Sequence, residues 1–280
     1  MGVKNSLLFR WLGVAGIELV KGEKTLIIDP YLTRVPFRKM FFTKVLPDKG
    51  LIKAHIKRCS GLLITHAHID HLMDAPEVIK NTGCIAYGSE NTCRILSFCG
   101  VDKEKIKEVA AGDILEIGNI KIEVFDSIHR RILGFNKGKI KRPLKAPLKA
   151  RQYIMDSSFS FHIDNGDIAL MTDPGIDNTQ DNFKKADVLF IGVTYLEKYL
   201  RSMLEYISPK LIIPIHWDDI FSPLSKPIRP FFKPPSRKSP FIKRIVLDDL
   251  KKLIEKIDPG IKLFFPEIFK TYDLEVILGA

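Results

Sequence analysis

The chain has 280 residues, of which 45% are hydrophobic and 28% charged, as in a globular protein with a substantial core. No apolar run is long enough to cross a bilayer, and Arg10 and Glu18 interrupt the apolar N-terminal stretch, which argues against a secretion signal. The formal net charge of +11 favours an acidic partner or substrate.

Short apolar runs bounded by turn residues predict a series of strands in the first half of the chain. They are "LLFRWL", "IELV", "TLIID", "GLLIT", "CIAYG" and "DILEIGNIKIEVFD", the last with a hairpin turn at Gly118 and Asn119. Helical patterns lie between these runs at about 72–80 and 90–99.

A second series of strands follows: "SFSFHID", "IALMTD", "DVLFIGV" and "KLIIPIH", with a turn at Asn165 and Gly166. Helices are predicted near 196–207 and over "LDDLKKLIEKI", which ends before Asp258. Strands followed by helices in both halves favour an α+β fold with two sheets packed face to face and helices outside. We expect a single domain over 1–280.

Two loop inserts hold the positive charge. Residues 130–151 carry nine Lys or Arg and residues 221–245 carry seven, and neither segment contains an acid. The remaining 28 basic residues are outnumbered by the 33 acidic ones. Six prolines exclude a regular helix or a central strand from the second insert. The four cysteines form no CxxC pair, so we expect reduced, structural thiols and a cytoplasmic protein.

The stretch "THAHIDHL" (residues 65–72) concentrates histidines in a chain that has only seven. His66, His68, Asp70 and His71 follow the strand "GLLIT", at an edge where loops gather ligand groups. Crowded imidazoles favour a bound cation, and four ligands from one loop can begin two metal sites but complete neither.

The missing ligands are predicted at the ends of later strands. His129, Asp173 and His216 each follow an apolar strand directly or within a few residues. By contrast, His162 alternates with Phe inside a strand and His55 lies in a basic helical stretch, so we expect neither to bind metal.

These residues resemble the metallo-β-lactamase superfamily, whose signature HxHxDH is present as His66, His68, Asp70 and His71. The resemblance covers about residues 6–220 and implies a four-layer αββα sandwich with a dinuclear site at one edge. It implies His66, His68 and His129 on one metal and Asp70, His71 and His216 on the other, with Asp173 bridging. Asp29, in "IIDPYL", matches the family's DP turn.

The resemblance implies a metal-dependent hydrolase in which two divalent ions activate a shared hydroxide, oriented by Asp70. Zinc is the first expectation, with manganese or iron as alternatives. Asp29, Asp218 and Asp219 are candidate partners that orient the ligands from outside. "PIHWDDIFSPL" (residues 214–224) resembles the ascorbate-6-phosphate lactonase-like hydrolases and, more distantly, the N-acyl phosphatidylethanolamine phospholipase D group.

Three functions remain open on these residues. The first is a hydrolase of an anionic, phosphate-bearing small molecule or lipid, acting on an ester, lactone or phosphodiester. The second is a nuclease or other nucleic-acid phosphodiesterase, favoured by the basic inserts but not by their few stacking aromatics in 130–151. The third is a non-catalytic member of the fold. Because both inserts mix cations with large apolar residues, we also expect them to rim the metal site and to contact anionic membranes peripherally.

Overall fold

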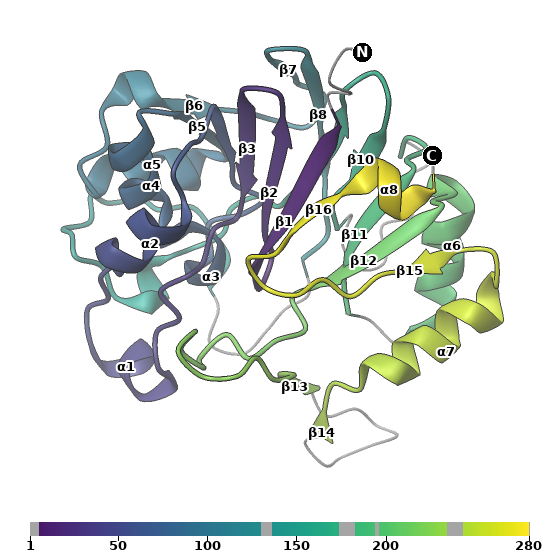
Figure 1. Cartoon of the computed structure of the whole chain (residues 1–280). Coiled ribbons are helices and arrows are strands. Elements are labelled where there is room, and N and C mark those ends of the chain that lie inside the picture. Colours follow the sequence, from purple (N-terminus) through teal and green to yellow (C-terminus); the bar gives the residue numbers. More distant parts are fainter. Residues whose placement is uncertain (1–5, 130–135, 174–182, 194–195, 234–242, 280) are drawn as a thin grey trace.

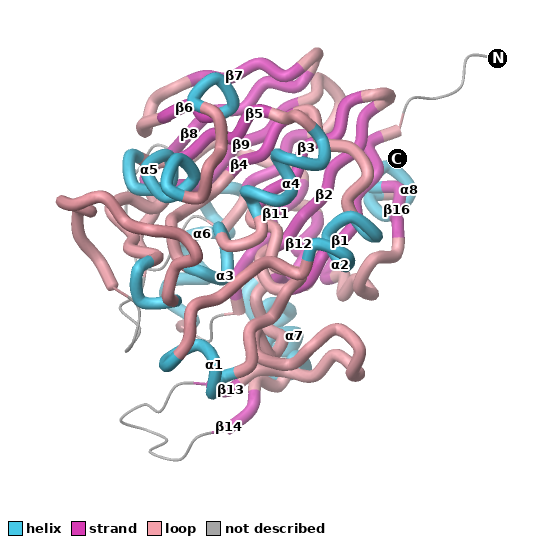
Figure 2. The backbone as a smooth tube through the Cα atoms, turned by 90° about the vertical axis from the view of Figure 1, so that its left-hand side faces the viewer, coloured by secondary structure: helices cyan, strands magenta, loops and turns pink. Residues whose placement is uncertain are grey.

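The computed structural model describes residues 6–129, 136–173, 183–193, 196–233 and 243–279. Two seven-stranded mixed sheets stack face to face, and helices cover their outer faces (Figure 1; Figure 2). A two-stranded ribbon, β13 (Phe232–Lys233) and β14 (Lys243–Arg244), lies apart from both sheets. The predicted αββα layering is therefore present.

The first sheet has the strand order β16-β1-β2-β3-β4-β5-β6. Its strands, in chain order, are β1 (Leu7–Gly13), β2 (Gly16–Lys21), β3 (Lys24–Ile28), β4 (Gly61–Leu63), β5 (Ile85–Gly88), β6 (Ile106–Glu108) and β16 (Thr271–Asp273). Strands β3 to β6 are parallel, so their C-terminal ends meet at one edge of the sandwich. The loop after β4 therefore opens at that edge.

The second sheet has the order β15-β12-β11-β10-β9-β8-β7. Its strands are β7 (Ile114–Ile117), β8 (Ile120–Asp126), β9 (Phe159–Asp164), β10 (Ala169–Met171), β11 (Val188–Gly192), β12 (Leu211–Ile215) and β15 (Lys262–Leu263). The hairpins predicted at Gly118 and at Asn165 join β7 to β8 and β9 to β10. Both turn predictions are confirmed.

The helices fall into groups by layer. Their bounds are α1 (Phe37–Phe42), α2 (Lys49–His55), α3 (Ile69–Leu72), α4 (Ala75–Thr82), α5 (Glu90–Phe98), α6 (Glu197–Ile207), α7 (Leu247–Ile257) and α8 (Leu274–Leu278), with short 3-10 turns at Lys103–Lys105 and Ala150–Gln152. Helices α2, α4 and α5 lie against the first sheet, and α6 and α7 against the second (Figure 1). None of the helices in the described ranges has the length and hydropathy of a membrane span.

Three apolar layers follow from the strand period of two. In β4, Leu62 faces the helices of the first sheet while Leu63 faces the second sheet. In β12, Leu211 faces the first sheet and Ile212 faces α6 and α7. Each central strand is thus buried on both faces, which explains why these runs are continuously apolar rather than alternating.

Some elements and contacts depart from the sequence predictions. Helix α1 and the closing strands β15 and β16 carry no strong periodic pattern and were not predicted, whereas the basic helical stretch around His55 is α2. In the first basic insert, Ile140 and Leu148 are buried in the core beside the first sheet, so their apolar character serves packing. The expectation that these two side chains enter a membrane is therefore wrong, whereas residues 130–135 lie outside the described residues.

Candidate metal centre

The histidine-rich loop runs from the C-terminal end of β4 into the single turn of α3. His68 precedes that turn, and Ile69 and Leu72 anchor it in the core. A short anchored turn fixes the direction of the polar side chains around it, because its backbone has little freedom to move. His66, His68, Asp70 and His71 are all at most 4% exposed.

Two histidines from the second sheet complete the cluster. His129 follows β8, and its ring centroid lies 4.5 Å from that of His66 and 4.8 Å from that of His68. His216 follows β12, adopts a left-handed φ of 56° and donates its N–H to the carbonyl oxygen of Val14 at 2.8 Å. This bond ties the end of β12 to the turn between β1 and β2.

The ligand atoms form two compact groups, each with one member from the second sheet. His66, His68 and His129 make one, and Asp70, His71 and His216 make the other, with one ligand atom of each residue within 4.8 Å of the others. These are the two sets that the sequence resemblance implies. Each of them provides three donors, the number that a catalytic zinc site takes from the protein.

Two buried polar atoms in these groups have no hydrogen-bond partner in the described structure: Nε2 of His66 and Oδ1 of Asp70. An unpaired polar atom is costly in a protein interior, and one metal ion at each group would satisfy these two atoms. The residues present therefore fit divalent cations.

Burial keeps His66 and His68 in the form that binds metal. Loss of solvent lowers the pKa of His68 to about 4 and holds the pKa of His66 well below its usual value, and neighbouring histidines lower the latter further. Neutral imidazole offers a lone pair, whereas imidazolium does not. Burial raises the pKa of Asp70, but His71 and His216 outweigh it and keep this carboxylate ionised.

One carboxylate orients a histidine of each group. Oδ2 of Asp29 lies 2.8 Å from Nδ1 of His71, and because a carboxylate only accepts, Nδ1 donates and Nε2 keeps its lone pair. Thr65 donates its hydroxyl proton to the same Asp29, so its oxygen accepts from Nδ1 of His66 at 3.0 Å. His66 Nε2 is thereby left free to bind a metal. Asp29, a candidate orienting residue in the sequence, thus contacts both His71 and Thr65.

Asp218 and Asp219 also lie behind the site, in different roles. Asp218 is fully buried, forms an ion pair with Arg34 and accepts the N–H of Val14 at 3.0 Å. Asp219 instead accepts from the backbone of Phe221 at 3.1 Å and pairs with Arg229. Asp218 therefore fastens the loop after His216 to the β1–β2 turn, and Asp219 shapes the next turn.

Arg34 is a partner that the sequence analysis missed. Its guanidinium is 1% exposed and donates to the carbonyl oxygen of Asp219 at 3.0 Å as well as to Asp218. A Cβ at Gly13, which has a φ of 91°, would lie 2.2 Å from Arg34 Nη2, so this position needs glycine. No local pattern marks Arg34, because its partners lie more than 180 residues away.

Asp173 lies outside both groups of three. Its Oδ2 accepts the N–H of Gly192 at 3.2 Å, and its carbonyl oxygen accepts from Ser160. A Cβ at position 192 would stand 2.6 Å from that carboxylate oxygen, so glycine there makes room for Asp173. Its predicted bridging role stays a prediction.

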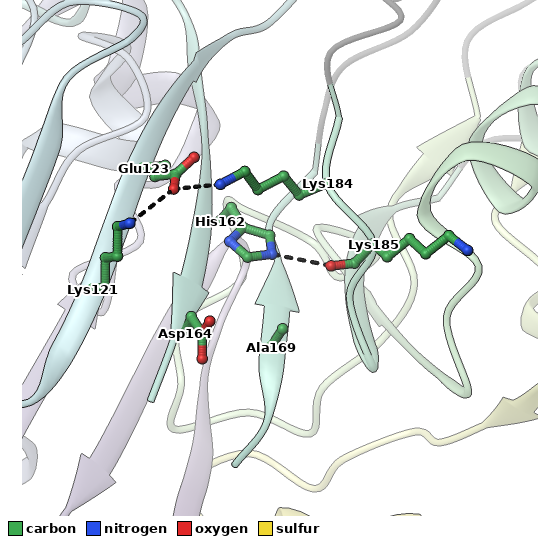
Figure 3. A pocket seen from close by; sticks show the side chains of 7 residues that line it. All are labelled: Lys121, Glu123, His162, Asp164, Ala169, Lys184 and Lys185. Carbon is green, nitrogen blue, oxygen red and sulfur yellow. Dashed lines mark hydrogen bonds and ion pairs between the residues drawn. The ribbon is translucent and has the colours of Figure 1, made fainter. Parts of the chain in front are cut away.

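The two histidines predicted not to bind metal lie elsewhere. His162 faces outward from β9 in a hollow of about 330 Å³, with Lys121, Glu123 and Lys184 around it (Figure 3). Its Nε2 donates to the carbonyl oxygen of Lys185 at 3.1 Å. His55 stacks on Phe269, with ring centroids 3.8 Å apart. Within the described ranges, neither histidine belongs to a group of potential ligands.

Both basic inserts reach the cluster. The carbonyl oxygen of Asn136, in the first insert, lies 3.3 Å from Nε2 of His68. In the second, the N–H of Phe231 donates to the carbonyl oxygen of Trp217, next to His216, at 2.7 Å. These contacts place Asn136 beside His68 and Phe231 beside the loop that carries His216, while the prediction that both inserts rim the site stays a prediction.

Comparison with known proteins places the chain in a family. Residues 24–217, more than half of the chain, match the model of the beta-lactamase superfamily domain. A "UPF0173 metal-dependent hydrolase" of Polynucleobacter asymbioticus is 25% identical over 77% of this chain and 75% of its own length. One of the same kind from Ruegeria sp. is 23% identical over 94% of this chain and 98% of its own.

Solved structures agree on the fold. Igni18, a metallo hydrolase of Ignicoccus hospitalis, has a TM-score of 0.60 at 14% identity, covering 95% of this chain and 97% of its own. The metallo-beta-lactamase fold protein YhfI of Bacillus subtilis has a TM-score of 0.58 at 13% identity, covering 96% and 100%. CmlA, a diiron β-hydroxylase of Streptomyces venezuelae, has a TM-score of 0.59 at 14% identity, covering 97% of this chain and 55% of its own.

These matches confirm the predicted fold. They also confirm the predicted enzyme class, a metal-dependent hydrolase, without its substrate. The likeness to one narrower branch is not decided by them. The chain belongs to the β-lactamase superfamily and has the metallo-β-lactamase fold.

Proposed function

We propose that this chain hydrolyses an anionic, phosphate-bearing ester, lactone or phosphodiester of a small molecule or lipid, with one divalent ion at each of its two ligand groups. The observation that carries the proposal is the pair of three-residue groups, each holding a buried polar atom that has no partner among the described residues. The names of the curated relatives support the same reaction class.

The residues divide the work in a defined way. Bound divalent ions would supply Lewis acidity and lower the pKa of water. The three-residue groups would hold them, and Asp29 keeps His71 and, through Thr65, His66 in the tautomers that ligation needs. Asp70 contacts His216 at 3.3 Å through Oδ2, so its Oδ1 remains to bind an ion or to orient the attacking water. Asp173 is proposed as the bridging acid, and zinc as the first metal, ahead of manganese or iron.

The anionic substrate is inferred from charge. In the described part of the first insert, residues 136–151, there are seven Lys or Arg and no acid, and this segment contacts His68 through Asn136. A positive rim beside a buried site raises the local concentration of anions. The sequence "PIHW" (residues 214–217) supports the lactonase-like and phospholipase D-like branch by its resemblance to that branch.

A nucleic-acid phosphodiesterase is the alternative that the same charge favours. Base stacking needs exposed aromatic rings, and residues 136–151 contain no Phe, Tyr or Trp. For the first insert, whose Asn136 contacts His68, the small-molecule or lipid substrate is therefore the better supported of the two.

The test is a hydrolase panel on metal-loaded protein, covering phosphodiesters, phosphorylated lactones, neutral lactones, thioesters and single-stranded RNA. We expect turnover of the anionic esters or lactones and none of it in His68→Ala. Turnover of neutral substrates alone would contradict the anionic specificity. Cleavage of RNA alone would replace this proposal with the nuclease.

A further inference from the structure

We propose that the metal-site end of the molecule docks on an anionic lipid bilayer through one surface, formed by α1 and the β13–β14 ribbon. We call it the α1–β13 face and define it by Phe37, Arg38, Lys39, Phe42, Phe232 and Arg244. Both parts lie at the same end of the sandwich (Figure 1; Figure 2), and Phe221, in the loop before β13, contacts Phe37 of α1. This inference concerns where the protein works and holds whichever substrate is hydrolysed.

Helix α1 presents apolar side chains to solvent while it is anchored from below. Met40 is 4% exposed and packs in the core beside the first sheet, which fixes the helix on the protein. Phe42 is 80% exposed and Phe37 is 58% exposed. Leu46, just after the helix, is 65% exposed. Exposed apolar side chains are ordinary when scattered singly, but a gathered group indicates a partner.

The β13–β14 ribbon continues this apolar group. Phe37 meets Phe221 edge to face, with ring centroids 5.1 Å apart, and Phe221 lies 5.7 Å from Phe231. Phe231 in turn lies 5.9 Å from Phe232, which is 43% exposed. A chain of rings therefore joins α1 to the ribbon.

The charge around these rings has one sign. No acid occurs between Asp29 and Asp48, or between Asp219 and Asp248. Arg38 and Lys39 are exposed and make no ion pair with any described residue, and the guanidinium of Arg244 lies 4.7 Å from the ring of Phe232. Cations and aromatic rings combined on one surface match the interface of an anionic bilayer, where cations meet headgroups and apolar side chains enter below them.

The face is joined to the ligand loops. The N–H of Phe231 donates to the carbonyl oxygen of Trp217, the residue after His216. Arg34, which lies two residues before Pro36, the N-terminal cap of α1, donates to the carbonyl oxygen of Asp219. Docking would therefore bring the metal ligands toward the membrane. Leu46 adds an aliphatic side chain that hydrocarbon accepts but base stacking does not use, which favours lipid over RNA.

Co-sedimentation of the full, metal-loaded chain with vesicles tests the proposal. The vesicles contain either phosphatidylcholine alone or phosphatidylcholine with phosphatidylglycerol, each at low and high salt. We expect binding to the anionic vesicles that salt weakens, and at most weak binding to the neutral ones. Equal binding to both, or binding to neither, would overturn the proposal, as would binding to single-stranded RNA without binding to vesicles.

Matched variants locate the surface. The double reversal Arg38→Glu/Lys39→Glu should lower partitioning onto anionic vesicles by about thirtyfold or more, since each cation contributes about fivefold. The control Lys80→Glu/Lys103→Glu makes the same change in net charge. Its two residues lie just before the N-terminal ends of β5 and β6, at the opposite end of the sandwich, so it should lower partitioning much less. Equal losses in the two would show a net-charge effect and would overturn the assigned face.

A fluorescent variant gives an independent readout. In Phe42→Trp, anionic vesicles should shift the emission of the new indole to shorter wavelength, beyond any change in the parent protein. Unfolding temperature and metal content of each variant, unchanged from the parent, establish that it is folded. An indole that stays fully accessible to an aqueous quencher on bound protein would contradict insertion of α1.

Discussion

Two places in this molecule surround a histidine with charged side chains, and they differ in how those charges are satisfied. In the hollow on the second sheet, Glu123 pairs with Lys184 at 2.5 Å and with Lys121 at 3.5 Å, and His162 bonds the backbone of Lys185 (Figure 3). In the metal centre, His66 Nε2 and Asp70 Oδ1 are buried and have no partner in the described structure.

The difference shows what marks a functional site here. The hollow on the second sheet has a volume of about 330 Å³ and a histidine, but the described polar groups there pair mostly with one another. The candidate metal centre is recognised by convergent ligand atoms that a bound cation would satisfy. Several metal-ligating atoms that converge, with unpaired buried atoms among them, are therefore a better guide than a cavity or a histidine alone.

The largest contrast is expected between two histidine substitutions. His68→Ala removes a donor from one group of three and should lower hydrolysis by about a thousandfold or more, because a metal contributes several kcal/mol of charge stabilisation. His162→Phe should keep both activity and metal content. Steady-state rates and metal analysis of both variants check this, and metal loss in His162→Phe with retention in His129→Ala would reverse the assignment.

Ion pairs in the two places should differ in stability. Arg34→Leu leaves the buried carboxylate of Asp218 without its partner and should lower the free energy of unfolding by about 3–5 kcal/mol. Glu123→Gln breaks pairs with half-exposed lysines, which should cost about 1 kcal/mol or less. Urea unfolding of both variants measures the difference. Similar losses in the two would contradict the structural role of Arg34.

Asp29→Asn should weaken metal binding by about 10–100-fold without unfolding the protein. The amide nitrogen would donate toward Nδ1 of His71 and so favour the tautomer with its proton on Nε2, the atom needed for ligation. Titration calorimetry with Zn²⁺ measures the affinity. An unchanged affinity in Asp29→Asn would show that Asp29 does not set the tautomer.

The smallest contrast concerns pH, where two carboxyl groups act with opposite sign. Burial raises the pKa of Asp74 to about 6, despite hydrogen bonds from Thr33 and Leu32. Its protonated form is thus favoured by folding, so its contribution to stability is fully present below about pH 4 and is lost as the pH rises through about 6.

For Glu123, burial raises the pKa, but Lys184 and Lys121 outweigh it and lower the pKa overall. Its contribution is present at neutral pH and is lost on acidification.

Urea unfolding between about pH 3 and 7 tests this pair, because the pKa of Glu123 lies below its ordinary value. In Asp74→Asn, the free energy of unfolding should fall less than in the parent as the pH rises. In Glu123→Gln, it should fall less than in the parent as the pH drops. The asparagine can still accept both backbone N–H groups that Asp74 accepts. A pH profile in Asp74→Asn identical to that of the parent would contradict the raised pKa.

The sequence was informative where local pattern determines structure. Strand-end positions located His129 and His216, because a buried strand has to end in a loop at the edge of the sheet, and those loops meet in the sandwich. Gly118 and Asn165 predicted hairpins for similarly local reasons. Asp29 could be selected because "IIDPYL" resembles the DP turn of the metallo-β-lactamase superfamily.

Other features depend on contacts between distant segments. Arg34 carries no local signal, since Asp218 becomes its partner only when β12 reaches the β1–β2 turn. The strand β16 is three residues long and exists because β1 offers it an edge. Ile140 and Leu148 had the composition of a membrane-contacting loop and are buried instead. In each case tertiary packing, not local propensity, decides the outcome.

Metal content of the native protein tests the central claim most directly. Elemental analysis of the purified chain, repeated after dialysis against Zn²⁺ and Mn²⁺, should give about two divalent ions per chain, one for each group of three donors. The content should fall in His68→Ala and stay the same in His162→Phe. If the native protein held no transition metal and bound none when it was supplied, the two groups would not be a metal centre and the proposed hydrolysis would be wrong.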